Sequence, residues 1–332
     1  MTSELTPHFY QHILSSSNQE AWKAIHNFLV EVWRSPVTSS SPHKEISIRD
    51  NIVHELDLFL SSAAWDLWEQ YPGMAQSTSQ RLEEWWKNNS SGKAVLILDG
   101  FSLRELPWLL LGAEENGFEL NISLSGAEIP SDTTTFAQSL GFDQRSKLQN
   151  NKARSPKFPD ANVESDKLPW NDCVSLVPNT PNVIFWHEWP DEEMHRNDGA
   201  GAGMQRLVQS TASTLRSKDF WNFVDKLSTG RKLIITSDHG YAITSNFSTQ
   251  HAQDSWLQQN FGKQRFAHAL DTSPPFLLPL VLKLEPTGRK PVFSINGRWK
   301  WKVQGGFPVL SHGGLTLLEM AVPFLEVQKK QK

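Results

Sequence analysis

The N-terminal part of the chain carries hydrophobic side chains at helical spacing. The apolar positions of its first clear segment lie three or four residues apart, on one face of a helix: Trp22, Ile25, Phe28, Leu29 and Val32. A second such segment covers residues 52–60, and the stretch KNNSSGK at residues 87–93 carries Asn, Ser and Gly, which indicate a break. We therefore expect an α-helical lead-in over residues 1–91, followed by a second domain over residues 92–332.

After this break, short hydrophobic runs alternate with helix-like segments. The candidate strands are AVLILD, FELNISLS, NVIFWHEW and KLIITSD, and a helix is expected after the first, third and fourth. Strands that alternate with helices predict an α/β fold with a doubly wound, mainly parallel sheet. In such sheets, ligands bind beyond the carboxyl ends of the strands. Asp99 and Asp238 each stand at the end of such a run, so we expect both at that edge.

Three further segments have patterns of their own. Residues 144–170 are polar, rich in Pro, Lys and Asn, and without periodicity, which is typical of a loop. Its cations, Arg145 among them, either face solvent or gather an anionic substrate. The turn pair Asn296-Gly297 within KPVFSINGRWKWKVQ predicts a hairpin. The segment LTLLEMAVPFLEV is amphipathic, and we expect a helix there.

Composition and charge narrow the classes of function. The formal net charge of -4 and the pI near 6.3 disfavour bulk binding of nucleic acid. The chain shows neither the mark of a secretory signal nor an apolar run long enough to cross a bilayer, so we expect a cytoplasmic protein that does not enter membranes. Cys173 is the only cysteine, which excludes an intramolecular disulfide. The 14 tryptophans follow no fixed period, and we interpret most of them as packing residues.

Six aspartate and histidine side chains, in four fragments, occur in the chain order of a two-metal phosphoryl-transfer site. They are Asp99 in VLILDG, Asp191 and His195 in DEEMH, Asp238 and His239 in ITSDHGY, and His312 in LSHGG. Carboxylate oxygen and imidazole nitrogen are natural ligands for zinc and manganese. Asp191 and His195 lie four residues apart, so one helical turn places both on the same face. Taken singly, each fragment also fits an ordinary role as a helix cap, a solvated face or a turn.

A hydroxyl-rich segment, EIPSDTTTFAQSLGF, supplies a candidate nucleophile. Its hydroxyls belong to Ser131, Thr133, Thr134 and Thr135, at the start of a predicted helix. The free N–H groups of that helix start would stabilise a bound phosphoryl group. The alternative is a Ser/Thr-rich helix cap, and a metal-activated water is the other candidate nucleophile.

The order of these fragments resembles the PglZ domain family of the alkaline phosphatase superfamily. The resemblance covers roughly residues 93–325 and is carried by LDGFSLRELPWLL, ITSDHGYA and LSHGGLTLLEMAVPFLEV, with the Pro-x-x-Thr of the hydroxyl-rich segment. It implies a sheet of alkaline phosphatase type and two divalent metal ions, with zinc expected and manganese as the alternative. The implied ligand sets are Asp191, His195 and His312 for one ion, and Asp99, Asp238 and His239 for the other.

The same resemblance implies a catalytic role for Thr133. This residue would bridge the ions, attack phosphorus and form a covalent phospho-enzyme, with Thr134 as the alternative. Arg104, five residues after Asp99, is the candidate for contact with the phosphate. The expected enzyme is a metal-dependent phosphoesterase that hydrolyses phosphodiesters of nucleotide or oligonucleotide type.

The resemblance also implies a biological setting. PglZ domains occur in bacterial phage-defence and signalling systems, so protein partners in such an assembly are expected. The alternative hypothesis is a metal-stabilised, catalytically weak interaction module of a phage-defence complex, which docks through the Trp-rich lead-in.

Overall fold

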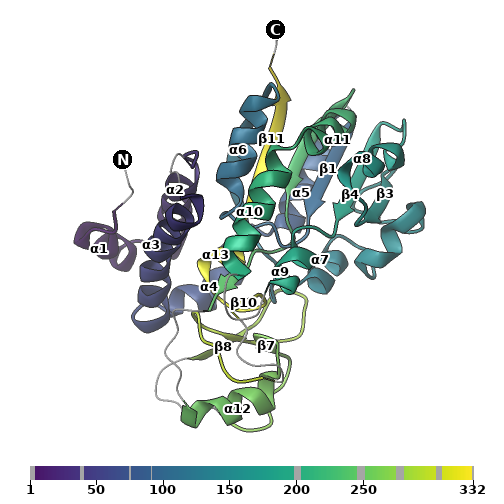
Figure 1. Ribbon diagram of the computed structural model, residues 1–332. Helices are drawn as coiled ribbons and strands as arrows, with labels where there is room; N and C mark the ends of the chain where they lie inside the picture. Colours follow the sequence, from purple (N-terminus) through teal and green to yellow (C-terminus); the bar gives the residue numbers. More distant parts are fainter. Residues whose placement is uncertain are drawn as a thin grey trace.

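The lead-in is helical, as predicted (Figure 1). The computed structural model describes residues 4–37, 41–74, 76–90, 92–197, 203–244, 251–273, 280–303 and 309–330. The lead-in helices are α1 (Pro7–Ser15), α2 (Asn18–Trp33), α3 (Pro42–Ser62), α4 (Asp66–Met74) and α5 (Thr78–Asn88). Ser17 and Glu20 begin α2 as a capping box, in which each side chain accepts the backbone N–H of the other residue. All five apolar positions predicted for this helix are buried.

The central sheet has six strands in the order β2-β11-β5-β1-β4-β3. They are β1 (Lys93–Leu98), β2 (Phe118–Gly126), β3 (Asn162–Asp166), β4 (Asn182–His187), β5 (Lys232–Thr236) and β11 (Ala321–Lys329). β5, β1, β4 and β3 pair in parallel, whereas β11 is antiparallel to both of its neighbours. The predicted mixed α/β fold with a mainly parallel sheet is therefore confirmed.

Both faces of the sheet are covered, because successive side chains of β1 point to opposite sides. Leu96 and Leu98 lie in one hydrophobic cluster with residues of the lead-in, α6 and α11, whereas Val95 and Ile97 lie in a second cluster with residues of α5 and α7. The remaining helices are α6 (Leu106–Glu115), α7 (Thr133–Ser139), η1 (Arg145–Asn151), α8 (Trp170–Cys173), η2 (Val174–Leu176), α9 (Asp191–Arg196), α10 (Gly203–Arg216), α11 (Lys218–Ser228), α12 (His251–Phe261) and α13 (Leu317–Met320). Among the described residues, no helix combines the length and apolar character that crossing a membrane requires.

A smaller sheet lies beyond the carboxyl ends of the parallel strands, in the lower part of Figure 1. It consists of β7 (Phe266–Ala267), β9 (Val292–Ile295) and β8 (Val281–Leu284), all antiparallel. β6 (Ala242–Ile243) and β10 (Leu310–Ser311) pair as a separate two-stranded antiparallel ladder. Along the chain, β6 follows β5 of the central sheet and β10 follows β9 of the small sheet. The loops after β5 and β10 therefore lie between the central sheet and the small sheet (Figure 1).

The lead-in packs into the same core as the sheet. Its tryptophans are buried: Trp22, Trp33 and Trp68 belong to the cluster that contains Leu96 and Leu98 of β1. A buried ion-pair network adds to this packing. Asp50 of α3 accepts from Arg104 and Arg298, and Asp57 of α3 accepts from Arg298 and from the N–H of Leu317. The chain starts β1 where the second domain was predicted to begin, but the hydrophobic core crosses that boundary.

The prediction of a loop over residues 144–170 was wrong in part. β3 lies within this range and forms an edge of the central sheet, parallel to β4. Its sequence NVESD contains a single apolar side chain, so no hydrophobic pattern predicts a strand there. The backbone hydrogen bonds to β4 hold it in place instead.

Two predictions for the last third of the chain also need correction. The helix expected over LTLLEMAVPFLEV is only the single turn α13, and the rest of the segment is β11. A strand buried on both faces is apolar at nearly every position, which explains the ambiguity. The hairpin expected at Asn296-Gly297 does not form in the described residues: β9, which precedes it, pairs with β7 and β8 instead. Residue 304, the end of the predicted hairpin, lies outside the described part of the chain.

Candidate metal centre

The six candidate ligands come together at the carboxyl edge of the sheet. Asp99 follows β1, Asp238 and His239 follow β5, Asp191 and His195 lie on α9, and His312 follows β10. Within the described part of the chain they form two groups, and the ligand atoms of each group lie within 4.8 Å of one another. The outer group is Asp191, His195 and His312, and the inner group is Asp99, Asp238 and His239.

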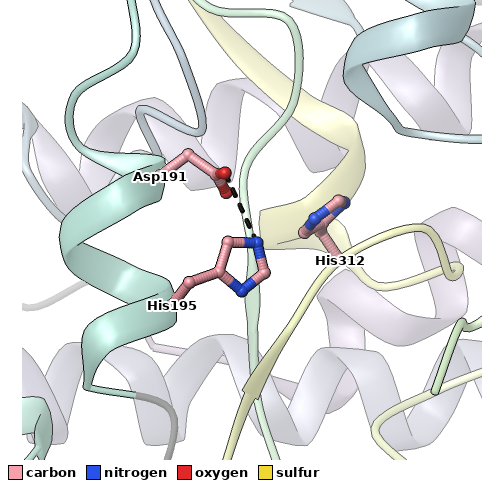
Figure 2. Close-up of side chains that lie close together, drawn as sticks. All are labelled: Asp191, His195 and His312. Atoms are coloured by element: carbon pink, nitrogen blue, oxygen red, sulfur yellow. Dashed lines mark ion pairs between the residues drawn. The ribbon is translucent and has the colours of Figure 1, made fainter. Parts of the chain in front are cut away.

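The outer group stands on one turn of α9, with His312 facing it from another loop (Figure 2). Asp191 and His195 are joined by a 3.3 Å contact between Oδ2 and Nε2. The backbone N–H of Asp191 donates to the carbonyl of Asp99 at 2.8 Å, which fixes the start of α9 against the end of β1. Gly100 is needed here, since its φ is +70° and a Cβ would lie 3.1 Å from the Cβ of Asp191.

The inner group is fully buried. His239 Nε2 lies 3.4 Å from Asp238 Oδ2 and 3.9 Å from Asp99 Oδ1. The backbone N–H groups of Gly100 and His239 donate to Asp238 Oδ1 at 2.9 and 3.0 Å. Burial raises the pKa of Asp99 well above its usual value, and the neighbouring carboxylates of Asp238 and Asp191 raise it further. The guanidinium of Arg145 opposes this rise in pKa but does not cancel it.

Backbone carbonyls orient two of the imidazoles. His239 Nδ1 donates to the carbonyl of Gly240 at 3.0 Å, and His312 Nδ1 donates to that of Ser131 at 3.2 Å. A carbonyl only accepts, so Nδ1 carries a proton in both rings, and Nε2 is the nitrogen that remains for binding an ion. Burial and the nearby His239 lower the pKa of His312 to about 4, which keeps this imidazole neutral at physiological pH.

These residues fit divalent metal ions. The two groups supply carboxylate oxygens and imidazole nitrogens, the donor types that zinc and manganese accept. Asp191 Oδ1 is buried without a hydrogen-bond partner, an arrangement that is costly unless another group satisfies it. The pKa of Asp191 is nevertheless low: burial opposes ionisation, but the hydrogen bond with His195 and the nearby His312 stabilise the carboxylate.

Thr133 lies against the inner group. Its Oγ1 is 2.9 Å from Asp238 Oδ2, 3.3 Å from Asp99 Oδ1 and 3.5 Å from His239 Nε2. Thr134, the alternative nucleophile, is exposed. The geometry thus separates two neighbouring hydroxyls that the sequence leaves equivalent.

The other hydroxyls of the segment have structural partners. Asp132 caps α7 and accepts the N–H groups of Thr134 and Thr135, and it also accepts the hydroxyl of Thr135. These N–H groups are therefore already satisfied, which disfavours the expected phosphoryl site at the start of α7. Ser131 accepts the N–H of Gly313 at 3.2 Å and so supports the loop of His312.

Arg145 is the cation of the site. Its guanidinium pairs with Asp99 Oδ2 and, at 3.2 Å, with Glu188 Oε2. The indole of Trp186 also donates to Asp99 Oδ2, at 3.1 Å. Sequence analysis placed Arg145 among several loop cations but gave no reason to select it, because the contact joins η1 to the end of β1. About a quarter of its side chain is exposed, so it reaches both the buried carboxylate and solvent.

Arg104 has a different role from the one expected. Its side chain is fully buried, and it donates to Asp50 of α3 and to the carbonyl of Tyr241. These contacts use the guanidinium to hold the lead-in against the loop after β5. We therefore do not propose Arg104 as a phosphate-binding residue.

The chain has only limited similarity to known proteins. No protein-family model matches the chain, and no curated protein matches it. An inactive variant of murine ectonucleotide pyrophosphatase/phosphodiesterase 5, solved in complex with AMP, is similar with a TM-score of 0.46 and 15% identity, over 71% of this chain and 88% of that chain. The human protein of that name gives a TM-score of 0.41 and 12% identity, over 71% of this chain and 87% of that chain. Similarity at these TM-scores and identities does not show a function, so the function of the site must be inferred from its own residues and geometry.

Proposed function

We propose that this chain is a metal-dependent phosphoesterase of the alkaline phosphatase superfamily, of the PglZ type, that hydrolyses phosphodiesters through Thr133. One observation carries the proposal. The Thr133 hydroxyl lies within 3.5 Å of two buried carboxylates and one imidazole, beside a second carboxylate-imidazole group. A hydroxyl in such surroundings has acceptors for its proton and a place for divalent cations next to its oxygen.

The two ligand groups would each hold one divalent ion, zinc first and manganese as the alternative. Asp191, His195 and His312 would hold one, and Asp99, Asp238 and His239 the other. When bound, such ions neutralise charge on phosphate oxygens and lower the pKa of hydroxyl groups beside them. Thr133 lies next to the inner group, so its hydroxyl is the one whose pKa such an ion would lower.

The proposed reaction proceeds in two displacements. Thr133 Oγ attacks phosphorus, a new O–P bond forms to the threonine, and the bond from phosphorus to one ester oxygen breaks. The hydroxyl proton passes first to Asp238, which accepts from Oγ1 at 2.9 Å, and the departing alkoxide leaves as an alcohol after it takes up a proton. Water then attacks the phosphothreonine and restores the Thr133 hydroxyl, so each cycle consumes one water and releases one alcohol and one phosphate monoester.

Arg145 would contact the phosphate. A guanidinium can donate to two phosphate oxygens at once, and the two nitrogens of Arg145 that would do so now pair with two separate carboxylates, those of Asp99 and Glu188. Its partial exposure lets it turn from Asp99 to a ligand without crossing the core.

The substrate class is proposed on the same basis. A diester carries a single negative charge between two leaving groups, and nucleotides and oligonucleotides are the common biological diesters. The net charge of -4 disfavours long polyanions and favours a small nucleotide substrate. We place the enzyme in the cytoplasm, in a bacterial phage-defence or signalling system with protein partners, as the resemblance to PglZ domains suggests.

The alternative, an interaction module that docks through the lead-in, has less support. Its tryptophans would be the docking residues, but four of the six, Trp22, Trp33, Trp68 and Trp86, are at most 3% exposed, and only Trp65 and Trp85 are partly exposed. Side chains that pack the core are not available to a partner.

The test combines metal content with hydrolysis. We would measure bound ions in the purified protein and its hydrolysis of bis-p-nitrophenyl phosphate and p-nitrophenyl phosphate. The comparison is between the parent, Thr133→Ala and the neighbouring control Thr134→Ala. We expect two ions in all three proteins, and activity on the diester that only Thr133→Ala loses. Full activity of Thr133→Ala would remove the nucleophile from the proposal, and a parent without bound metal would remove the site.

A further inference from the structure

Glu319 touches the loops of both ligand groups. Its side chain is fully buried, and Oε1 accepts the N–H of Gly314, two residues after His312, at 2.8 Å. Its backbone carbonyl accepts the N–H of Gly240, next to His239, at 3.0 Å. One residue of α13 therefore fixes the loop after β10 through its side chain and the loop after β5 through its backbone.

Arg265 holds the Glu319 carboxylate in place. Nε lies 2.8 Å from Oε1, and Nη2 lies 3.2 Å from Oε2. The same guanidinium donates to the carbonyls of Gly297 and Trp299, at 2.6 and 2.8 Å. Arg265 directly precedes β7, so the small sheet reaches the loop of His312 through this side chain.

The glycines of the His312 loop fit against this pair. A Cβ at Gly314 would lie 2.7 Å from both Nε and Nη2 of Arg265, so the guanidinium packs directly on the backbone there. Gly313 has a φ of +101°, and a Cβ on it would meet the ring of Phe266 at 2.8 Å. The loop is thus held between the Arg265-Glu319 pair on one side and β7 on the other.

From these contacts we propose that Glu319 and Arg265 are positioning residues for His312. They set the orientation of this imidazole toward Asp191 and His195, and they link the outer metal group to the small sheet. Neither residue is among the candidate ligands, so the pair acts on the ion only through the loop. This inference rests on the proposed function, because it presupposes that the outer group holds a metal ion.

The decisive variant is Glu319→Gln, in the full-length chain. A glutamine keeps the size of the side chain, and its oxygen can replace Oε1, but its NH2 group takes the place of Oε2 and faces the donor Nη2 of Arg265, and the negative charge is lost. Arg265→Lys is the second variant, because it keeps the charge but loses the forked contact with the carboxylate. The matched control is Arg231→Lys. Arg231 donates to the carbonyls of Pro178 and Thr180 at the other end of the sheet.

The measurement is zinc binding, by competition with a chelating dye and by ion count after dialysis. In Glu319→Gln and Arg265→Lys, we expect one of the two ions to bind about 10- to 100-fold more weakly, as when other partners of metal ligands are removed, and the second to be retained. For comparison, we expect His312→Gln to lose the outer ion and Asp238→Asn to lose the inner one. The two positioning variants should resemble His312→Gln, with a smaller loss of zinc affinity, and should not resemble Asp238→Asn. Arg231→Lys should bind both ions as the parent does.

The outcomes separate this inference from the proposed function. If Glu319→Gln or Arg265→Lys is folded, by far-UV circular dichroism, and binds both ions with parental affinity, the positioning role is overturned. An equal weakening of both ions, or a weakening also seen in Arg231→Lys, would overturn it too, since a general loss of stability would then suffice. A parent that binds no zinc would instead refute the proposed function itself.

Discussion

The imidazole rings of His239 and His312 are stacked, with their centroids 4.1 Å apart and their planes 12° from parallel. The two residues belong to different ligand groups and to loops that follow different strands. The contact makes the two groups a single unit, and each ring limits the positions open to the other.

Replacement of Asp238 by Asn should separate metal binding from folding. The amide oxygen still accepts the N–H groups of Gly100 and His239, but the charge is lost. We expect loss of the inner ion and a decrease in diester hydrolysis of more than about 100-fold, since a ligand and the proton acceptor of Thr133 are both impaired. Ion counts and steady-state rates check this.

The control for that experiment is Asp225→Asn, an exposed aspartate of α11 that pairs with Lys329. It should keep both ions and the parental rate. Retention of the inner ion by folded Asp238→Asn would contradict the ligand assignment.

Arg145→Gln should affect substrate binding more than metal binding. We expect KM for the diester to rise about 10-fold, the usual range for loss of one hydrogen bond to a charged group, with the number of bound ions unchanged. Lys147→Gln, an exposed cation two residues along η1, is the control and should leave KM as it is. A KM that is equal in both variants would show that Arg145 does not contact the substrate.

Asp57→Ala should destabilise the whole protein. It removes the carboxylate that pairs with Arg298 and accepts the N–H of Leu317, and it leaves a buried guanidinium without one of its partners. The expected loss in the free energy of unfolding is about 3–5 kcal/mol. Urea unfolding measures it, with the exposed Asp66→Ala of α4 as a control that should change little.

Cooperative unfolding is the second readout of Asp57→Ala. Because the lead-in shares its core with the sheet, tryptophan fluorescence and far-UV circular dichroism should report one transition. Two separate transitions would mean that residues 1–91 fold as an independent domain.

His187 should make stability depend on pH below neutrality. Burial lowers its pKa from 6.5 to about 4, and its ring accepts the N–H of Trp189 through Nδ1, which requires a neutral imidazole. The unfolded chain therefore binds a proton that the folded one does not, and stability falls as pH falls from 6.5 toward 4. The contribution of this group is about 3 kcal/mol over that range.

The measurement is urea unfolding of the metal-free protein between pH 7 and pH 4, for the parent and for His187→Gln. The parent should show the steeper decrease, and the difference between the two curves isolates this residue. Parallel curves would show that His187 is protonated at no cost in the folded protein.

Local patterns were sufficient for the parts of the site that stand next to strands or on one helical turn. Asp99 follows a hydrophobic run, and Asp191 and His195 share a turn of α9, so each was visible in a short window. The lead-in helix α2 was equally visible because its buried face repeats at helical spacing.

Long-range contacts were beyond such patterns. Arg145 meets Asp99 across 46 positions of sequence, and Arg265 meets Glu319 across 54. Nothing near either arginine marks it out from the other cations. β3 was missed because an edge strand needs few apolar residues. β11 was predicted as a helix because a strand that is buried on both faces lacks the alternation of apolar and polar residues.

The position of β11 also bears on the order in which the protein assembles during synthesis. β2 joins the sheet only through β11, which lies between it and β5. As the ribosome releases the chain from its N-terminus, residues 118–126 must wait for residues 321–329 before they gain a partner strand in the sheet. The sheet can then be completed only after residues 321–329 have emerged, so β2 has no partner strand while the segment between β2 and β11 is being synthesised.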